Sequence, residues 1–219
     1  MTDRHARGTV LAAVDQLHDM VLTMELLPGQ PMRQEALAVR LGTSRAGVRE
    51  ALRVLESEGI LEYRRNIGYA VARLTASQLE QAYLIRKALE TEVFRALPPL
   101  GTEQLDELAR INDELALAGE RREILTALKL NQKFHFTIFR ASGLDLVVDE
   151  LLRIWQLTDA YRAVYLYDQA ARERIVAEHT GLIEALRRGD TEALIRLADD
   201  HRGPIHDQIG PLLKHAATR

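Results

Sequence analysis

The chain has 219 residues, of which 47% are hydrophobic and 28% charged, with a formal net charge of −3 at neutral pH. This composition excludes a disordered or fibrous protein and fits one or two globular domains that are rich in helix. Because the chain contains no cysteine, disulfides, thiolate metal sites and cysteine nucleophiles are all excluded.

The first part of the chain predicts three helices followed by a small β-hairpin. Helical spacing relates Val10, Val14, Leu17 and Val21, and the segment LLPGQPM ends that helix. A short helix in RQEALAVRL leads to a turn at Gly42, and Thr43 or Ser44 then caps a third helix. After Gly59, β-favouring residues alternate on either side of RRNIG, with Arg64 and Arg65 near the tip. We therefore predict a winged helix-turn-helix domain over residues 8–73.

From Thr75 onward, helical periodicity dominates. Predicted helices span residues 76–97, 102–118, 121–142, 145–167, 169–188 and 191–202, with a short tail helix after Gly203-Pro204. Turn and cap residues in PPLGT, AGE, SGLD and GDT separate them. The fold class is thus mainly α, with an all-helical bundle over residues 76–213 as the second domain.

Positive charge gathers around the third predicted helix, SRAGVREALRVLESEGI. Residues 40–73 hold seven Lys and Arg against four Asp and Glu, although the whole chain is acidic. One face of this helix is an apolar stripe, and another carries Arg45, Arg49 and Arg53. In an isolated helix, such a face is usually only solvated. Here the small Ala46 and Gly47 allow close approach, and a short helix and a basic hairpin flank it, which favours DNA recognition.

The stretch LLPGQPMRQEALAVRLGTSRAGVREALRVLESEGILEYRRNIGYAVARL resembles the DNA-binding domain of the GntR superfamily of bacterial transcriptional regulators. The resemblance implies DNA contacts by Arg33, Ser44, Arg45, Ala46 and Arg49, with Ser44 on a phosphate, and a wing that approaches the minor groove at Gly68. Gln34 replaces a residue that is usually acidic, and Ala46-Gly47 replaces the commoner Thr-Pro. These departures leave the operator sequence open.

Polar residues interrupt the apolar stripes of the predicted bundle. Arg86 lies on a stripe with Ala82 and Val93, so it needs either an internal carboxylate, which we favour, or an anionic ligand. A histidine on an apolar face is usually satisfied within the core, but three helices here carry one each.

His179 and His201 flank the same turn at nearly equal distances, ten residues before Gly189 and eleven after Asp190. In an antiparallel helix pair they stand within about 1.5 Å of the same height. Asn131 and His135, one turn apart on a third helix, are able to add an amide oxygen and an imidazole. The four residues are candidate ligands of one ion.

YLIRKALE, NQKFHFTIFRASG, AEHTGLIEALRRGD and LADDHR resemble the FCD effector domain of the FadR-like branch of GntR regulators, over residues 76 to about 202. The resemblance implies a divalent ion, zinc or nickel, held by His135, His179 and His201, and a small organic acid beside it. Asn131 stands where an aspartate is usual, and its neutral oxygen is a weaker ligand. Arg86, and with less support Arg174, are expected to pair with the acid.

The leading hypothesis is a ligand-responsive transcriptional regulator that binds a short inverted-repeat operator as a homodimer, and not an enzyme. An alternative is a metal-dependent hydrolase in which the three histidines activate water. It lacks a general base, since Glu178 is expected to face away. A third hypothesis treats the histidines as structural, in a regulator that senses its ligand without metal.

No membrane or targeting segment is expected. Apolar runs stay short of the roughly 18 residues that span a bilayer. Acidic residues occupy the N-terminal stretch where a signal peptide is apolar. The sequence therefore predicts a cytoplasmic protein with no membrane partner.

Overall fold

The structure is a computed structural model that describes the backbone of residues 2–216 and the side chains of residues 8–203. The chain forms two compact units, Met1–Arg73 and Leu74–Arg219. Among the described residues, no helix combines the length and the apolar character that crossing a membrane requires.

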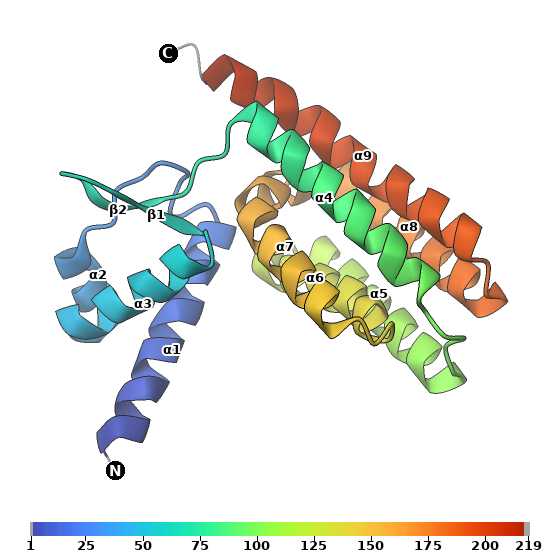
Figure 1. Cartoon of the computed structure of the whole chain (residues 1–219), viewed down its shortest axis with the longest axis horizontal. Helices are drawn as coiled ribbons and strands as arrows, with labels where there is room; N and C mark the ends of the chain where they lie inside the picture. Colours follow the sequence, from blue (N-terminus) through green and yellow to red (C-terminus); the bar gives the residue numbers. More distant parts are fainter. Residues whose placement is uncertain (1, 217–219) are drawn as a thin grey trace. The chain divides into compact units, whose positions relative to one another are not determined.

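Over the described residues 2–73, the first unit consists of three helices and a hairpin (Figure 1). In chain order these are α1 (Thr2–Leu22), α2 (Gln34–Arg40), α3 (Arg45–Ser57), β1 (Leu61–Arg64) and β2 (Gly68–Val71). α3 packs against both α1 and α2. It does so with an apolar face on which Val48, Leu52 and Leu55 are completely buried. The predicted winged helix-turn-helix is thus confirmed.

β1 and β2 form an antiparallel pair in which Tyr63 lies opposite Tyr69. Their rings pack edge to face, with centroids 5.3 Å apart. The turn between the strands contains Asn66 at a positive φ of 70°, a conformation that asparagine tolerates better than most residues. Pro31 forms a β-bridge with Ala70, so the segment after α1 lies along the second edge of β2. This pairing holds the wing to the body of the unit.

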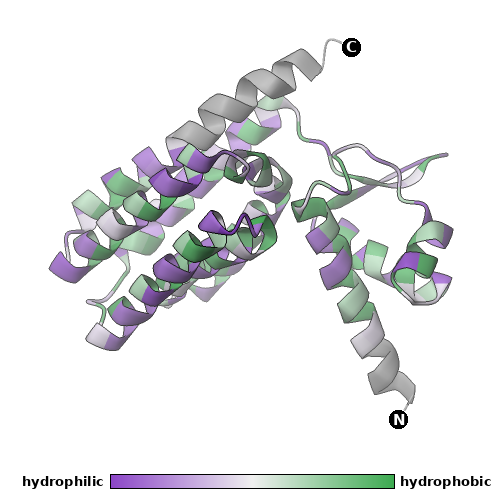
Figure 2. Ribbon diagram, turned by 180° about the vertical axis from the view of Figure 1, so that it is seen from behind, coloured by the Kyte–Doolittle hydropathy of each residue, from purple (hydrophilic) through white to green (hydrophobic). Residues whose placement is uncertain are grey.

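Over residues 74–216, the second unit is a bundle of six helices. They are α4 (Ala76–Arg95), α5 (Thr102–Glu120), α6 (Ile124–Arg140), α7 (Asp145–Leu166), α8 (Gln169–Arg188) and α9 (Thr191–Ala216). α4 packs against α7 and α9, while α8 packs against α5 and α9. Phe134, Phe139 and Trp155 are fully buried in the core. Hydrophobic and hydrophilic residues alternate along the helices (Figure 2), as expected where each helix buries one face.

Capping residues set several helix boundaries in this bundle. Thr75 and Gln78 form a capping box that starts α4. The Asp168 side chain accepts a hydrogen bond from the Ala170 amide at the start of α8, and Gly189 ends α8 in the left-handed conformation, with φ of 64°. These caps lie at or beside positions where the sequence predicts breaks between helices.

Two boundaries differ from the prediction by three residues or more. Arg122 has a positive φ of 58°, so α6 begins at Ile124 and not at residue 121. The separate tail helix is wrong, because α9 continues through Gly203-Pro204 to Ala216. A proline inside a helix costs about 3 kcal/mol. The packing of α9 against α4 and α8 anchors the helix that precedes this proline.

Candidate functional site

The N-terminal end of α3 is an exposed edge built on a buried face. Ser44 caps the helix, and its Oγ accepts a hydrogen bond of 3.0 Å from the Gly47 amide. Arg45, Ala46 and Arg49 are exposed. Because the opposite face of α3 is fixed in the core, this edge is presented rigidly to solvent.

Arg45 pairs with Glu35 of α2 at 2.8 Å, and the two side chains are 69% and 77% exposed. An ion pair this exposed contributes no more than about 1 kcal/mol, so Arg45 is available to another anionic partner at low cost. Arg33, also exposed, stands at the N-cap position of α2.

Two glycines near this edge have different explanations. A Cβ on Gly47 would lie 2.8 Å from the Thr43 hydroxyl oxygen, so local crowding already favours a small residue there. Close approach to another surface is therefore not needed to explain Gly47. Gly68 begins β2 with φ of +88°, and a Cβ there would meet nothing within 4 Å. The backbone conformation itself requires glycine at the base of the wing turn.

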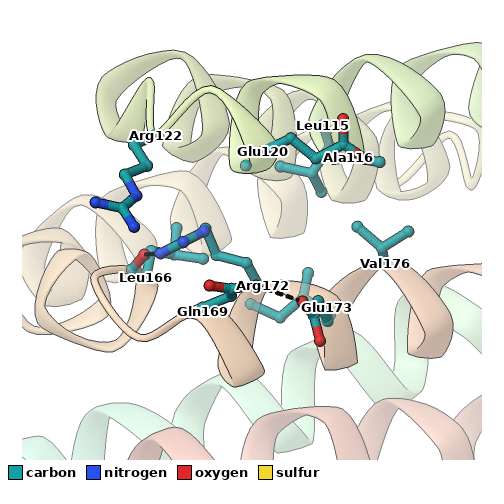
Figure 3. Close-up of a pocket in the computed structure, with 11 residues that line it drawn as sticks. Leu115, Ala116, Glu120, Arg122, Leu166, Gln169, Arg172, Glu173 and Val176 are labelled. Carbon is teal, nitrogen blue, oxygen red and sulfur yellow. Dashed lines mark hydrogen bonds between the residues drawn. The ribbon is translucent and has the colours of Figure 1, made fainter.

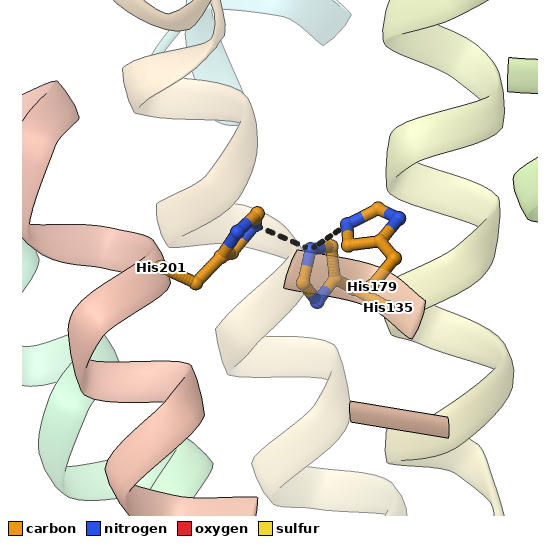
Figure 4. Close-up of side chains that lie close together, drawn as sticks. All are labelled: His135, His179 and His201. Atoms are coloured by element: carbon orange, nitrogen blue, oxygen red, sulfur yellow. Dashed lines mark hydrogen bonds between the residues drawn. The ribbon is translucent and has the colours of Figure 1, made fainter. Parts of the chain in front are cut away.

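In the second unit, three histidines from three helices meet in the core (Figure 4). His135 on α6, His179 on α8 and His201 on α9 are 4%, 0% and 6% exposed. The Nε2 atom of His135 lies 3.1 Å from Nε2 of His201 and 3.2 Å from Nε2 of His179. One potential ligand atom from each residue lies within 4.8 Å of the others. The predicted gathering of these histidines is confirmed by the structure.

Neighbouring side chains set the tautomers of two of these rings. Asn112 donates its amide Nδ2 to the Val176 carbonyl, so its Oδ1 accepts from His179 Nδ1 at 3.2 Å. The Glu178 carboxylate accepts from His201 Nδ1 at 2.6 Å. With the proton on Nδ1, each ring turns an Nε2 lone pair toward His135.

The expectation that Glu178 faces away is wrong. Glu178 adjoins His179 in sequence, but its long side chain reaches across from α8 to the ring of His201 on α9. Its carboxylate contacts Nδ1, on the side of the ring remote from the three Nε2 atoms. Glu178 thus orients a candidate ligand, as carboxylates beside metal-bound imidazoles do.

Burial keeps two of the three imidazoles neutral. Desolvation lowers the pKa of His135 and of His179 well below the ordinary value of 6.5, and neighbouring imidazoles lower both further. The His179 ring also stacks on Phe134, with centroids 3.8 Å apart and planes 3° from parallel. Two neutral, rigidly held imidazoles are suited to bind a cation.

Asn131 lies one turn before His135 on α6 and is 7% exposed. Its Oδ1 atom is buried and has no hydrogen-bond partner among the described side chains and backbone. Asn131 and His201 line the same cavity of about 20 Å³, which is enough for one water molecule or ion. A buried acceptor without a partner is costly, so an ion or a donor from a ligand would satisfy it.

A cluster of buried charges borders this cavity. Arg86 Nε donates to Glu90 at 3.0 Å, so the internal carboxylate favoured for Arg86 is one turn away. Arg202 donates to the other oxygen of Glu90, and Trp155 Nε1 adds a bond of 3.1 Å. Burial by itself would raise the pKa of Glu90, but Arg86 and Arg202 outweigh it and lower the pKa below 4.5. Glu90 is therefore ionised.

Two arginines of this cluster have guanidinium N–H groups that donate no hydrogen bond within the described part of the chain. Arg162 on α7 pairs with Asp159, and its guanidinium carbon lies 4.0 Å from the centroid of the Trp155 ring. Within the described part of the chain, Nε and Nη1 of Arg162 and Nη1 of Arg86 are buried without hydrogen-bond partners. Both arginines line the cavity beside Asn131. Buried guanidinium N–H groups of this kind are suited to an anion.

Sequence reasoning missed several residues here. Arg162, Arg202 and Glu90 are as buried as Arg86, and the charged residues within the apolar stretch LTDAYRAVYL were the available signal for Arg162. Arg174 does not line this cavity. Its side chain is 41% exposed, and its Nε lies 3.7 Å from Oε1 of Glu178. Arg174 is therefore connected to the histidines only through the Glu178 carboxylate.

Comparison with known proteins agrees with both units. Residues 9–71 match the gntR family of bacterial regulatory proteins, and residues 81–203 match the FCD domain. The Nta operon transcriptional regulator of Aminobacter aminovorans is 30% identical over 203 residues, which cover 91% of this chain and 93% of that protein. The HTH-type transcriptional repressor RspR of Escherichia coli is 25% identical over 185 residues, covering 84% and 81%.

The solved structure of E. coli McbR/YncC shares the fold. Its TM-score is 0.79 at 24% sequence identity, over 95% of this chain and 98% of that chain. The family and these relatives are transcriptional regulators and not enzymes, so the hydrolase alternative finds no support. The chain belongs to the GntR family of bacterial transcriptional regulators, in the FadR-like branch whose C-terminal domain is an FCD domain.

Proposed function

We propose that the protein is a homodimeric, cytoplasmic regulator whose affinity for a short inverted-repeat operator changes when a small organic acid binds beside a divalent ion in the FCD domain. The observation that carries this proposal is the convergence of three imidazole nitrogens next to two buried arginines with unused N–H groups. The proposed domains are residues 8–73 for DNA and residues 76–213 for the effector and the dimer contact.

For DNA recognition, the proposed contacts come from the N-cap of α2, the start of α3 and the wing. They are Arg33, Ser44, Arg45, Ala46, Arg49 and Gly68. Arginines at the start of α3 are placed to read base edges in the major groove, as in other helix-turn-helix proteins. A two-fold symmetric dimer would present two such edges to the two halves of an inverted repeat.

The proposed ion ligands are His135, His179, His201 and Asn131. Tetrahedral zinc with Zn–N bonds of about 2.05 Å places neighbouring nitrogens about 3.3 Å apart. The 3.1 and 3.2 Å separations from His135 Nε2 are close to this value. Zinc or nickel suits a site rich in imidazole. The bound ion would supply a Lewis acid for one carboxylate oxygen of the effector.

For the effector, the proposal places the carboxylate between the ion and the unused N–H groups of Arg86 and Arg162. Arg174 would act indirectly, since it pairs with the Glu178 carboxylate that orients His201. The ion ligands lie on α6, α8 and α9, and the two arginines lie on α4 and α7. An acid bound there would tie five helices together and favour one arrangement of the dimer over another.

Elemental analysis of protein purified without a histidine tag tests the metal site. We expect about one zinc or nickel ion per chain, and a loss of that metal in His179→Ala. The matched control is His18→Ala, which changes a histidine of the first unit. Metal-free protein that gains no thermal stability from added zinc or nickel would leave the histidines structural and contradict the metal site.

A test of effector-dependent DNA binding needs an operator sequence. Selection of duplexes that the protein binds, from a random duplex pool, supplies one. Fluorescence anisotropy then follows operator binding by zinc-loaded protein as acetate is added, with chelator-treated protein as the control. We expect acetate to shift operator affinity only when zinc is present. Equal operator affinity with and without acetate, at acetate concentrations that saturate the protein, would contradict regulation through this site.

A further inference from the structure

The cavity at the proposed acid site is too small for an organic acid of several carbons. Its volume is about 20 Å³, and Arg86, Asn131, Arg162 and His201 are among the residues that line it. A cavity of this size has room for about one water molecule. An acid whose carboxylate lies there must therefore extend into a neighbouring space.

A much larger cleft adjoins this cavity. It measures about 410 Å³ and lies between α5 and α8, beside the C-terminal end of α7. Figure 3 shows Ala116 of α5 and Val176 of α8 on opposite sides of it. Pockets that hold small molecules measure about 300–1,000 Å³. Leu166 and Ile175 line both the cleft and the small cavity, so two buried apolar side chains form the wall between them.

Part of the cleft lining suits an apolar group. Its apolar side chains are Leu115, Ala116, Leu166, Ile175 and Val176, and the polar residues Glu120, Arg122, Gln169 and Glu173 line it as well. The guanidinium of Arg172, which also lines the cleft, is engaged by the carbonyl oxygens of Leu166 and Tyr167 at 2.8 and 3.0 Å. The buried guanidinium N–H groups without partners, those of Arg86 and Arg162, thus lie on the far side of the wall, and the five apolar side chains lie on the near side.

The small cavity has a second neighbour, but opening it is costlier. Arg202 separates the cavity from a groove of about 240 Å³ along α4 and α9, and ion pairs with Glu90 and Asp199 hold it. On the other side, the side chains that form the wall are apolar and carry no ion pair, although the Leu166 carbonyl accepts a hydrogen bond from Arg172. Ile175 is β-branched and stiff within α8, whereas Leu166 is unbranched at Cβ and is the last residue of α7. A ligand that occupies both spaces therefore requires the Leu166 side chain to change its rotamer.

We propose that the cleft between α5 and α8 holds the body of the effector, while its carboxylate lies at the ion, Arg86 and Arg162. The effector is then an acid with an apolar body of several carbon atoms. This inference rests on the proposed function of the small cavity, and it adds the class of acid that the site selects.

A chain-length series on zinc-loaded protein tests the proposal. Calorimetry compares acetate, butyrate and hexanoate as probes, in wild type and in two variants of neighbouring α5 residues. Ala116→Phe fills the cleft, whereas Leu117→Phe, at an exposed position outside the lining, is the matched control. In wild type we expect about fourfold tighter binding for each added methylene, the gain for burying one CH₂. Ala116→Phe should abolish this gain and still bind zinc and acetate.

The outcomes separate the two proposals. A gain with chain length that Ala116→Phe removes and Leu117→Phe keeps would support the cleft. Equal affinity for acetate and hexanoate in wild type, or a gain that survives in Ala116→Phe, would overturn it and leave the proposed acid site standing. If none of the three acids binds zinc-loaded wild-type protein, the proposed function fails, and this inference fails with it.

Discussion

Glu90 is the shared partner of two buried arginines, so its replacement by glutamine tests the buried charge cluster directly. One oxygen accepts from Arg86 and from Trp155 Nε1, and the other accepts from Arg202. Glu90→Gln keeps the shape of the side chain and an oxygen for Trp155. It removes the negative charge, so the two guanidinium groups would face each other across a neutral amide.

The expected loss follows from burial. Removing one partner of a buried ion pair costs about 3–5 kcal/mol. Because the amide still accepts a hydrogen bond, we expect the free energy of unfolding to fall by the lower end of this range, about 3 kcal/mol. For a protein of this size, 1 kcal/mol corresponds to about 2–4 °C in melting temperature, so Tm should fall by about 6–12 °C.

Glu92→Gln on the same helix is the matched control. Glu92 pairs with Arg95 but is 61% exposed. Its loss should cost no more than about 1 kcal/mol. Differential scanning calorimetry of the full chain in the presence of chelator measures both variants without a contribution from metal. If Glu90→Gln lowers Tm no more than Glu92→Gln does, the argument that Glu90 neutralises two buried cations is refuted.

Three further predictions concern DNA, effector and pH. Arg49→Ala should weaken operator binding about 5- to 150-fold, because an arginine–guanine contact is worth about 1–3 kcal/mol. Fluorescence anisotropy measures the operator affinity, with Arg95→Ala as the control. Unchanged operator affinity in Arg49→Ala would show that Arg49 does not contact the bases. Arg162→Lys keeps the positive charge but loses the planar guanidinium with its fork of N–H donors. Calorimetry should therefore show about tenfold weaker acetate binding at unchanged zinc content. Equal acetate affinity in the variant and the wild type would exclude Arg162 from the acid site. Without metal, the lowered pKa values of His135 and His179 mean that the unfolded chain binds more protons below about pH 6.5. The free energy of unfolding should therefore fall as the pH drops through that value, by up to about 1.4 kcal/mol per pH unit for each imidazole. Urea unfolding in chelator at about pH 7.5 and about pH 5.5 measures the difference, and equal free energies would contradict the prediction.

The histidine cluster was predictable because it depends on residue spacing along helices and on the length of the turn between them, and both can be read from the sequence. Helical rise and a short turn place His179 and His201 at one height, and their ring centroids are indeed 5.1 Å apart. Likewise, Asn131 and His135 lie on one face because they are four residues apart. Ser44 as an N-cap and Gly189 at a helix end follow from local backbone chemistry in the same way.

The surroundings of the cluster were not predictable, because they depend on how each helix is rotated in the bundle. Arg202 reaches Glu90 across 112 sequence positions, and no spacing rule relates the two residues. The direction of Glu178 depends on the crossing of α8 over α9, so its contact with His201 appears only in three dimensions. The continuation of α9 through Pro204 shows the same limit, since helix propensity alone predicts an end there.

Asn131 has a consequence for how the two proposed ligands depend on each other. With Asn131 and the three imidazoles as the proposed ligands, no protein atom that coordinates the ion would carry a negative charge, and the Glu178 carboxylate would act only through His201. The carboxylate of the effector would then be the counter-ion that coordinates the metal directly. Zinc should then bind more tightly when the acid is present, and the acid more tightly when zinc is present, by the same factor. The protein would respond to the coincidence of metal and acid, and weakly to either alone.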